Sequence, residues 1–176
     1  MPGLLTGKRG LIMGVANERS IAWGIAQALA GEGADLAFSY QGEAFGRRVV
    51  PLCDSVNGAF AMDADVTDAA SHEALFARIK ADWGGLDFLV HAVAFSAKEE
   101  LTGRFSDTSR ENFLTSMHIS CYSLIEMARR ARPLMTEGGA IVTLSFLGAS
   151  RVTPNYNVMG VAKAALESAT RYLAND

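Results

Sequence analysis

Short apolar runs and longer amphipathic stretches alternate along the whole chain. The short runs have the length and composition of buried strands. They lie at 10–13, 35–40, 58–62, 85–92 and 140–144. The longer stretches carry apolar residues at helical spacing. They lie at 20–30, 43–55, 69–83 and 109–132, and a last one begins around Tyr156. This alternation predicts a parallel sheet with helices on both faces.

Right-handed crossovers between these strands predict the strand order 3-2-1-4-5 of a Rossmann-type doubly wound α/β fold. In such a sheet a ligand binds at the carboxyl ends of the strands, where the winding reverses. The stretches with unusual composition all follow directly after a strand, on that edge. We therefore expect residues 1–176 to form a single dinucleotide-binding domain.

Composition removes several functional classes. Apolar residues make up 49% of the 176 residues, charged residues make up 20%, and the formal charge is −3. The chain therefore has no basic surface for nucleic acid or an anionic membrane. Neither its two cysteines nor its three histidines have metal-ligand spacing, so we expect no metal and reduced thiols. No signal-peptide pattern or membrane span is present, and we expect a cytoplasmic protein.

The first strand leads into Gly14-Val15-Ala16-Asn17-Glu18-Arg19-Ser20-Ile21. A dinucleotide pyrophosphate needs close backbone approach and a helix N-terminus. Gly14 can provide the turn, while the Ser20 hydroxyl and the Ser20 and Ile21 amides can act as donors. Ser20 is also a candidate N-cap of the helix that follows. One glycine stands where three are usual, so an ordinary strand-to-helix turn is an equal alternative.

The second strand ends at Gln41, where a dinucleotide fold meets the adenosine ribose. Gln41 is neutral and can bind a hydroxyl, which favours NADH, although Arg47 and Arg48 are near enough in sequence to reach back toward a phosphate. After the third strand comes Asp63-Ala64-Asp65-Val66-Thr67, in which a carboxylate could bind the adenine amino group. A helix cap by Asp65 or Thr67 is the alternative.

Small residues after the fourth strand, from Ala92 through Val93 to Ser96, would let a flat cofactor lie against the backbone. Ordinary close packing is the alternative for this stretch. Tyr156 and Lys163 follow the fifth strand and are seven residues apart, two helical turns. On one helix face a phenol and an ammonium can share a pocket, where the cation favours ionisation of the phenol. Such a pair suits proton donation to a developing oxyanion.

Together these residues resemble the short-chain dehydrogenase/reductase superfamily. The chain is most similar to its divergent branch of bacterial NADH-dependent enoyl-acyl-carrier-protein reductases. Three features carry the resemblance: Gly14-Val15-Ala16-Asn17 with Ser20-Ile21-Ala22, the spacing Tyr156-x6-Lys163, and the block Pro154-Asn155-Tyr156-Asn157-Val158-Met159-Gly160. Most of the superfamily has Tyr-x3-Lys instead.

The resemblance implies reduction of the trans-2 double bond of an enoyl thioester on acyl carrier protein, in fatty acid synthesis. Tyr156 would donate to the enolate oxygen and Lys163 would hold the nicotinamide ribose. The residues implied to line the NADH cofactor are Gly14, Ser20, Ile21, Gln41, Asp65, Val66, Val93 and Lys163. Ser96 stands where the family places a substrate contact. The resemblance also implies a homotetramer.

Two departures accompany the resemblance. Phe146 stands where many relatives have a second tyrosine, so we expect it to be a wall of the substrate site without a proton to donate. The family fold also continues past Asp176, so the C-terminal part of that fold is expected to be missing from these residues. Two other functions stay open: another reductase of the superfamily, such as a β-ketoacyl reductase, and a non-catalytic NADH-binding module.

Overall fold

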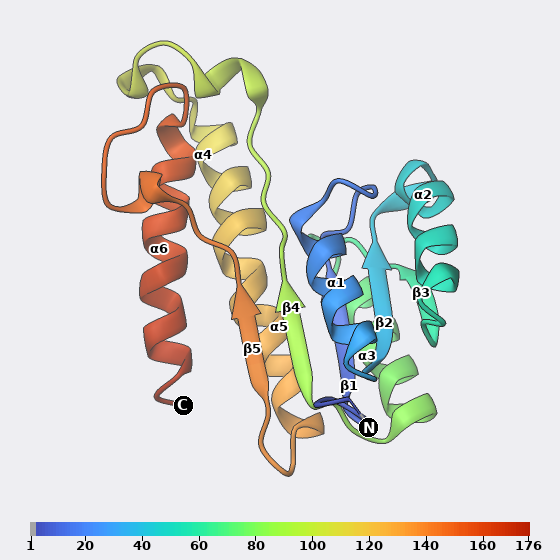
Figure 1. Cartoon of the computed structure of the whole chain (residues 1–176). Coiled ribbons are helices and arrows are strands. Elements are labelled where there is room, and N and C mark those ends of the chain that lie inside the picture. Colours follow the sequence, from blue (N-terminus) through green and yellow to red (C-terminus); the bar gives the residue numbers. More distant parts are fainter. Residues whose placement is uncertain (1–2) are drawn as a thin grey trace. The chain divides into compact units, whose positions relative to one another are not determined.

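The computed structural model of the protein describes residues 3–176. Its five-stranded parallel sheet has the order β3-β2-β1-β4-β5, which confirms the predicted Rossmann-type topology (Figure 1). The strands are β1 (Arg9–Met13), β2 (Asp35–Tyr40), β3 (Phe60–Asp63), β4 (Phe88–His91) and β5 (Ala140–Thr143). The strand ends differ from the predicted ones by up to three residues.

Within residues 3–176, six α-helices connect or follow the strands, and two of them, α4 and α5, lie between β4 and β5. They are α1 (Ile21–Gly31), α2 (Gly42–Ser55), α3 (Ala69–Trp83), α4 (Arg110–Met117), α5 (Ser123–Ala131) and α6 (Asn157–Leu173). Short 3-10 turns occupy Lys98–Leu101, Phe105–Asp107, Arg132–Leu134 and Leu147–Ala149. Within residues 3–176, no helix combines the length and the apolar character needed to cross a membrane.

The chain forms two compact units. The first comprises residues 3–92 and 129–143 and contains the whole sheet. The second comprises residues 93–128 and 144–176, which include α4 and α6. The residues predicted for the nucleotide loop therefore belong to the first unit, and Tyr156 and Lys163 belong to the second.

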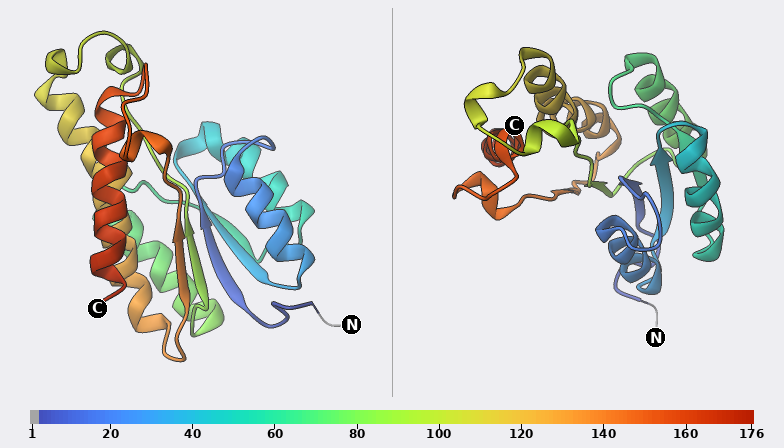
Figure 2. Two further views of the ribbon diagram at one scale, coloured as in Figure 1. Left: turned by 60° about the vertical axis from the view of Figure 1, so that its left-hand side comes forward. Right: turned by 90° about the horizontal axis from the view of Figure 1, so that it is seen from above.

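The core of the first unit lies on both faces of the sheet (Figure 2). On one face α1 and α2 pack against the strands, with Trp23 and Phe38 in ring contact at 6.4 Å between centroids. On the other face α3 contributes Leu75 and Ile79, both fully buried. Side chains point alternately to the two faces of a strand, so β1 and β2, covered on both sides, are apolar almost throughout.

The long helix predicted over 109–132 is interrupted. A π-helical segment, His118–Tyr122, separates α4 from α5. π-helical turns are rare in proteins, and those that occur often lie near functional sites. Here the segment buries Ser120 and Cys121. The single helix expected over 109–132 is therefore two α-helices joined by this segment.

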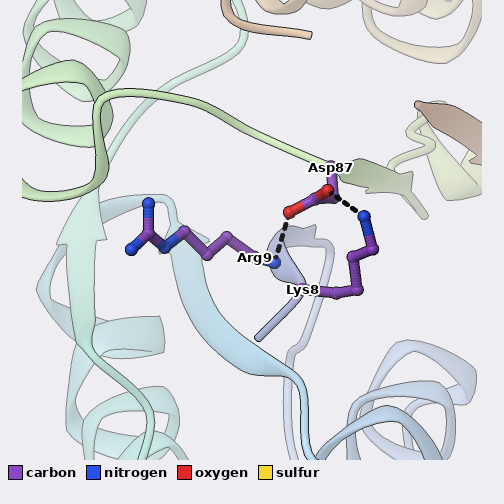
Figure 3. A network of polar contacts seen from close by, with 3 residues as sticks. All are labelled: Lys8, Arg9 and Asp87. Atoms are coloured by element: carbon purple, nitrogen blue, oxygen red, sulfur yellow. Dashed lines mark hydrogen bonds and ion pairs between the residues drawn. The ribbon is translucent and has the colours of Figure 1, made fainter. Parts of the chain in front are cut away.

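Asp87 joins the starts of β1 and β4 (Figure 3). Its carboxylate accepts hydrogen bonds from the Lys8 ammonium at 2.7 Å and from the Arg9 amide at 2.9 Å. Burial alone would raise the pKa of Asp87, but the bonds from Lys8 and Arg9 outweigh it and hold the pKa below its ordinary value. The carboxylate is therefore charged in the folded protein and sets the pairing of the two strands.

We expect Asp87→Asn to lower the free energy of unfolding by about 1 kcal/mol, because two charge-assisted bonds at a partly exposed site are weakened. The folded protein binds the Asp87 proton less tightly than the unfolded chain. The stabilisation is thus present above pH 3.8 and is lost as the pH falls through the lower folded pKa. Urea titrations of both proteins at pH 7 and pH 3 test this, since equal losses at the two pH values would contradict it.

Candidate active site

The turn after β1 is built on Gly14, as predicted. Gly14 has φ +93°, a conformation that favours glycine. A Cβ at this position would lie 2.0 Å from the carbonyl oxygen of Ala92. Only a glycine therefore lets the chain turn here, next to the end of β4. A backbone without a side chain at the carboxyl edge of the sheet fits the close approach that a pyrophosphate needs.

Ser20 is the N-cap residue of α1, as predicted, but its hydroxyl does not cap the helix. The hydroxyl accepts from the amides of Ala16 and Asn17 and donates to the Asn17 carbonyl. The Ser20 amide also donates to Asn17, at 3.1 Å. Two of the three predicted donors, the Ser20 hydroxyl and the Ser20 amide, therefore donate to the Asn17 carbonyl within the loop. The first amides of α1, beginning with Ile21, point along the helix axis toward any anion at this end.

Gln41 and Asp65, both predicted to contact the adenosine, are brought together. The Gln41 side-chain amide donates to Asp65 Oδ2 at 2.7 Å, and Thr67 donates twice to Asp65 Oδ1. Burial alone would raise the pKa of Asp65, but these bonds outweigh it and hold the pKa below its ordinary value. The predicted alternative, an N-cap of α3 by Asp65 or Thr67, is wrong because Asp68 caps the helix through the Ala70 amide.

The two arginines of α2 do not reach toward Gln41. Arg47 pairs with Glu43 one turn earlier, at 2.5 Å. The Arg48 guanidinium lies over the Phe45 ring and donates to the Ala44 carbonyl. Both guanidiniums are therefore engaged on their own helix.

Tyr156 and Lys163 lie in the second unit, but not as predicted. Tyr156 is the N-cap residue of α6, with φ −125° and ψ −27°, so it does not belong to the helix. The next residue, Asn157, has φ +34°. The side chain of Tyr156 therefore leaves the chain from a distorted turn, and helical spacing alone does not determine its direction.

The Tyr156 ring is held by the loop that follows β5. Phe146 contacts it at 4.8 Å between ring centroids. A Cβ at Gly148 would lie 2.4 Å from the Tyr156 ring, and a Cβ at Gly160 would lie 2.7 Å from the Gly148 carbonyl oxygen. Two glycines thus allow the loop and the ring to pack on α6. Tyr156 also lines a hollow of about 430 Å³ with Phe105, Val152 and Val161.

Burial raises the pKa of the Tyr156 phenol, and no cation offsets this. The prediction that Lys163 favours ionisation of the phenol is therefore wrong for this structure. The half-buried phenol is therefore protonated at neutral pH and has a proton available for donation. That protonation state suits stabilisation of a developing negative charge.

The Lys163 ammonium is buried and donates to the Leu144 carbonyl oxygen at 2.7 Å. Burial lowers its pKa, and the nearby Cys121 thiol acts in the opposite direction. One turn further on, Glu167 accepts from the Ser145 hydroxyl at 2.5 Å. Two side chains of α6 thus hydrogen-bond to Leu144 and Ser145, the two residues that follow β5 and precede Phe146. Sequence analysis did not identify Glu167.

The loop that carries Val93 and Ser96 is anchored by polar side chains of α4 and the π-helical segment. The Ser120 hydroxyl binds both the amide and the carbonyl of Phe95. Asn112, buried, binds the Ser96 hydroxyl at 3.2 Å and the Ala97 amide at 2.9 Å. The predicted substrate contact, Ser96, therefore already has a protein partner. Val93 is partly buried in the same loop.

Asn157 connects this loop to the start of α6. Its side-chain amide donates to the carbonyls of Glu100 and Thr102. The Glu100 carboxylate in turn accepts from the amide and hydroxyl of Ser109, the N-cap of α4. The hydrogen bonds from Ser109 lower the pKa of Glu100. The sequence signal for this connection was the asparagine next to Tyr156. Asparagine tolerates positive φ, the conformation that the structure shows at Asn157.

Comparison with known proteins gives one consistent result. A family profile described as enoyl-(acyl carrier protein) reductase matches residues 14–176. A Rhizobium meliloti protein named enoyl-[acyl-carrier-protein] reductase [NADH] 2 is 60% identical over all 176 residues. A Nostoc protein named for the same NADH-dependent reductase is 47% identical over 98% of the chain.

Solved structures agree with the sequence matches. An enoyl-acyl-carrier-protein reductase from Anaplasma phagocytophilum, solved with NAD, has a TM-score of 0.97 and 55% identity over the whole chain. One from Bacillus cereus, solved with NADP⁺ and indole naphthyridinone, has a TM-score of 0.97 and 49% identity over 99% of the chain. The chain spans 66% of the length of the Rhizobium protein and 67% of the Anaplasma structure.

Proposed function

Because this chain belongs to the enoyl-(acyl carrier protein) reductase family, we propose that it reduces the trans-2 double bond of enoyl thioesters, with NADH as the reductant. The thioester is carried by acyl carrier protein in the elongation cycle of fatty acid synthesis. The observation that carries the proposal is the protonated, half-buried Tyr156 phenol beside an open hollow, on the same unit as the buried Lys163 ammonium.

We propose a cofactor contact for each of the predicted residues. In the first unit, Gly14 and the start of α1, with Ser20 and Ile21, would face the pyrophosphate. Gln41 would bind the adenosine ribose, and Asp65 and Val66 the adenine. In the second unit, Val93 and Lys163 would contact the nicotinamide half. When bound, the reduced nicotinamide supplies the hydride for the β-carbon of the substrate.

Tyr156 is proposed to donate a hydrogen bond to the thioester oxygen, where negative charge develops during the reaction. A donor aimed at developing charge is worth on the order of 3 kcal/mol of barrier. Burial supports this role, because it raises the pKa of the phenol and keeps the proton in place at neutral pH.

Lys163 is proposed to hold the ribose hydroxyls next to the nicotinamide and to keep the local field positive. Its ammonium has three donors, of which the Leu144 carbonyl uses one. Phe146 is proposed as an apolar wall, and its ring contact with Tyr156 supports that role. Ser96 is proposed as a substrate contact in the loop anchored by Asn112.

A thioester reduction assay tests the proposed function. The protein is mixed with NADH and a crotonyl thioester, and loss of NADH absorbance is followed. The matched reaction contains an acetoacetyl thioester, the substrate of a β-ketoacyl reductase. We expect turnover of the enoyl thioester alone. Turnover of the ketone alone would contradict the proposal, and so would NADH binding with no turnover of either.

Assembly and location are part of the same proposal. We propose a homotetramer, supported by large apolar side chains that are exposed on the second unit. They are Phe113, Leu114, Tyr122, Ile125 and Tyr172. A monomer in sedimentation velocity at micromolar concentration would contradict it.

A cytoplasmic location is supported by two separately buried free thiols, Cys53 and Cys121, and recovery of the protein from the periplasm would oppose it.

A further inference from the structure

Two acidic side chains of the first unit accept hydrogen bonds from donors that follow the end of β2. Tyr40, the last residue of β2, pairs with Asp63, the last residue of β3. The Gly42 amide then donates to Asp63 Oδ1 at 2.8 Å, and the Gln41 side-chain amide donates to Asp65 Oδ2 at 2.7 Å. Both groups, which are next to the proposed ribose position, therefore donate to carboxylates at the end of β3 and directly after it.

This arrangement matters because NADPH differs from NADH only by a phosphate on the adenosine ribose. A phosphate needs hydrogen-bond donors and positive charge. Gly42 is the first residue of α2, so its amide belongs to a helix N-terminus, the part of a helix that binds anions best. Asp63 already supplies the anion at that amide. A phosphate placed there would lose the donor and meet a like charge.

No arginine compensates for the two carboxylates. Arg47 is paired with Glu43, and Arg48 lies over the Phe45 ring. Gln41 is limited as well. Because a carboxylate only accepts hydrogen bonds, Asp65 orients the Gln41 amide so that its NH₂ group faces the carboxylate and its oxygen remains for the ribose. That oxygen accepts from a hydroxyl but repels a phosphate, which has no proton to donate at neutral pH.

We propose that Asp63 is a specificity-determining residue of the cofactor site, where its carboxylate excludes the 2′-phosphate of NADPH and admits the 2′-hydroxyl of NADH. The inference rests on the proposed function only for the location of the ribose at Gln41. It concerns the ratio of two binding constants and needs no turnover.

The variant Asp63→Asn tests the role of the charge, because the asparagine oxygen can still accept from the Gly42 amide and the fold is kept. Dissociation constants of NADH and NADPH are measured by titrating cofactor fluorescence at low ionic strength. We expect the wild-type protein to bind NADH at least about tenfold more tightly than NADPH. Asp63→Asn should tighten NADPH binding by about tenfold and change NADH binding less than about twofold.

Two further variants make the result decisive. Asp35→Asn removes the same charge from an exposed residue at the opposite end of β2, and it should leave both constants unchanged. Asp63→Ala also frees the Gly42 amide, so NADPH should bind at least as tightly as it does to Asp63→Asn. The wild-type preference should shrink as salt is added, because screening weakens the repulsion.

An unchanged NADPH to NADH ratio in both Asp63 variants would overturn the inference, as would an equal change in Asp35→Asn. Absence of NADH binding to the wild-type protein would overturn it together with the cofactor assignment. Failure of the thioester assay alone would leave the binding ratio measurable, so the two proposals can fail separately.

Discussion

Tyr156→Phe is expected to lower kcat for a crotonyl thioester by about 10²- to 10³-fold while leaving NADH affinity nearly unchanged. The substitution removes one hydroxyl and keeps the ring. The packing against Phe146 at 4.8 Å and against Gly148 is therefore retained. The loss falls on kcat because the hydrogen bond strengthens only as charge develops on the thioester oxygen. Steady-state kinetics with NADH and the thioester measure it.

The matched control for this variant is Tyr172→Phe. Tyr172 lies on α6 and its side chain is 77% exposed, so removal of its hydroxyl should leave kcat unchanged. Because burial raises the pKa of Tyr156, the wild-type kcat should not fall through loss of this proton until the pH exceeds 10.0. A Tyr156→Phe enzyme with wild-type kcat would show that the phenol is not the proton donor.

Lys163→Met is the second large expected effect. The ammonium is proposed to bind the ribose hydroxyls, and a charge-assisted hydrogen bond is worth about 1.5–3 kcal/mol. NADH should therefore bind about 10- to 100-fold more weakly. Fold stability should change by no more than about 1 kcal/mol, because the loss of the bond to Leu144 is offset by removal of a buried charge.

Cofactor titration and urea unfolding together test this separation of function from stability. Burial lowers the pKa of Lys163, so the folded protein binds this proton less tightly than the unfolded chain. Wild-type stability should consequently rise as the pH approaches 10.5, and this rise should be missing in the variant. Lys98→Met, at an exposed position of the same unit, is the control. A variant that unfolds but keeps its NADH affinity when folded would indicate a purely structural lysine.

The sheet was predictable because strand pattern and crossover handedness leave few topologies. Each apolar run in the sequence became a strand, and the order β3-β2-β1-β4-β5 followed. The interruption of the long helix at His118–Tyr122 was not predictable. The consequence of this segment, the burial of Ser120 with its hydrogen bonds to the Phe95 backbone, depends on tertiary packing.

The roles of the candidate site residues stay predictions, and part of their geometry could not be derived from the sequence. Tyr156 was expected on a helix face, yet α6 begins at Asn157, after a residue with φ −125°. The cause is tertiary, because Gly148 and Gly160 bring the loop onto the helix and Asn157 binds the carbonyls of Glu100 and Thr102. The bonds of Asn157 join segments more than fifty residues apart, and local sequence patterns do not contain them.

The side-chain partners of the residues around Gln41 could not be predicted from the sequence either. The sequence left open whether Arg47 and Arg48 reach toward Gln41, because both directions are sterically possible from α2. The structure engages them with Glu43 and Phe45. Likewise the N-cap of α3 is Asp68, not Asp65 or Thr67, because Asp68 has extended backbone directly before the helix begins at Ala69.

The central claim is that the Tyr156 phenol and the Lys163 ammonium act on one nicotinamide and its substrate. A crystal structure of the protein with NADH and a non-reacting thioester analogue tests it most directly. The claim predicts the nicotinamide ribose within hydrogen-bond distance of Lys163 Nζ and the thioester oxygen within hydrogen-bond distance of the Tyr156 hydroxyl. A cofactor bound at Gly14 and Gln41 with its nicotinamide away from both groups would contradict it.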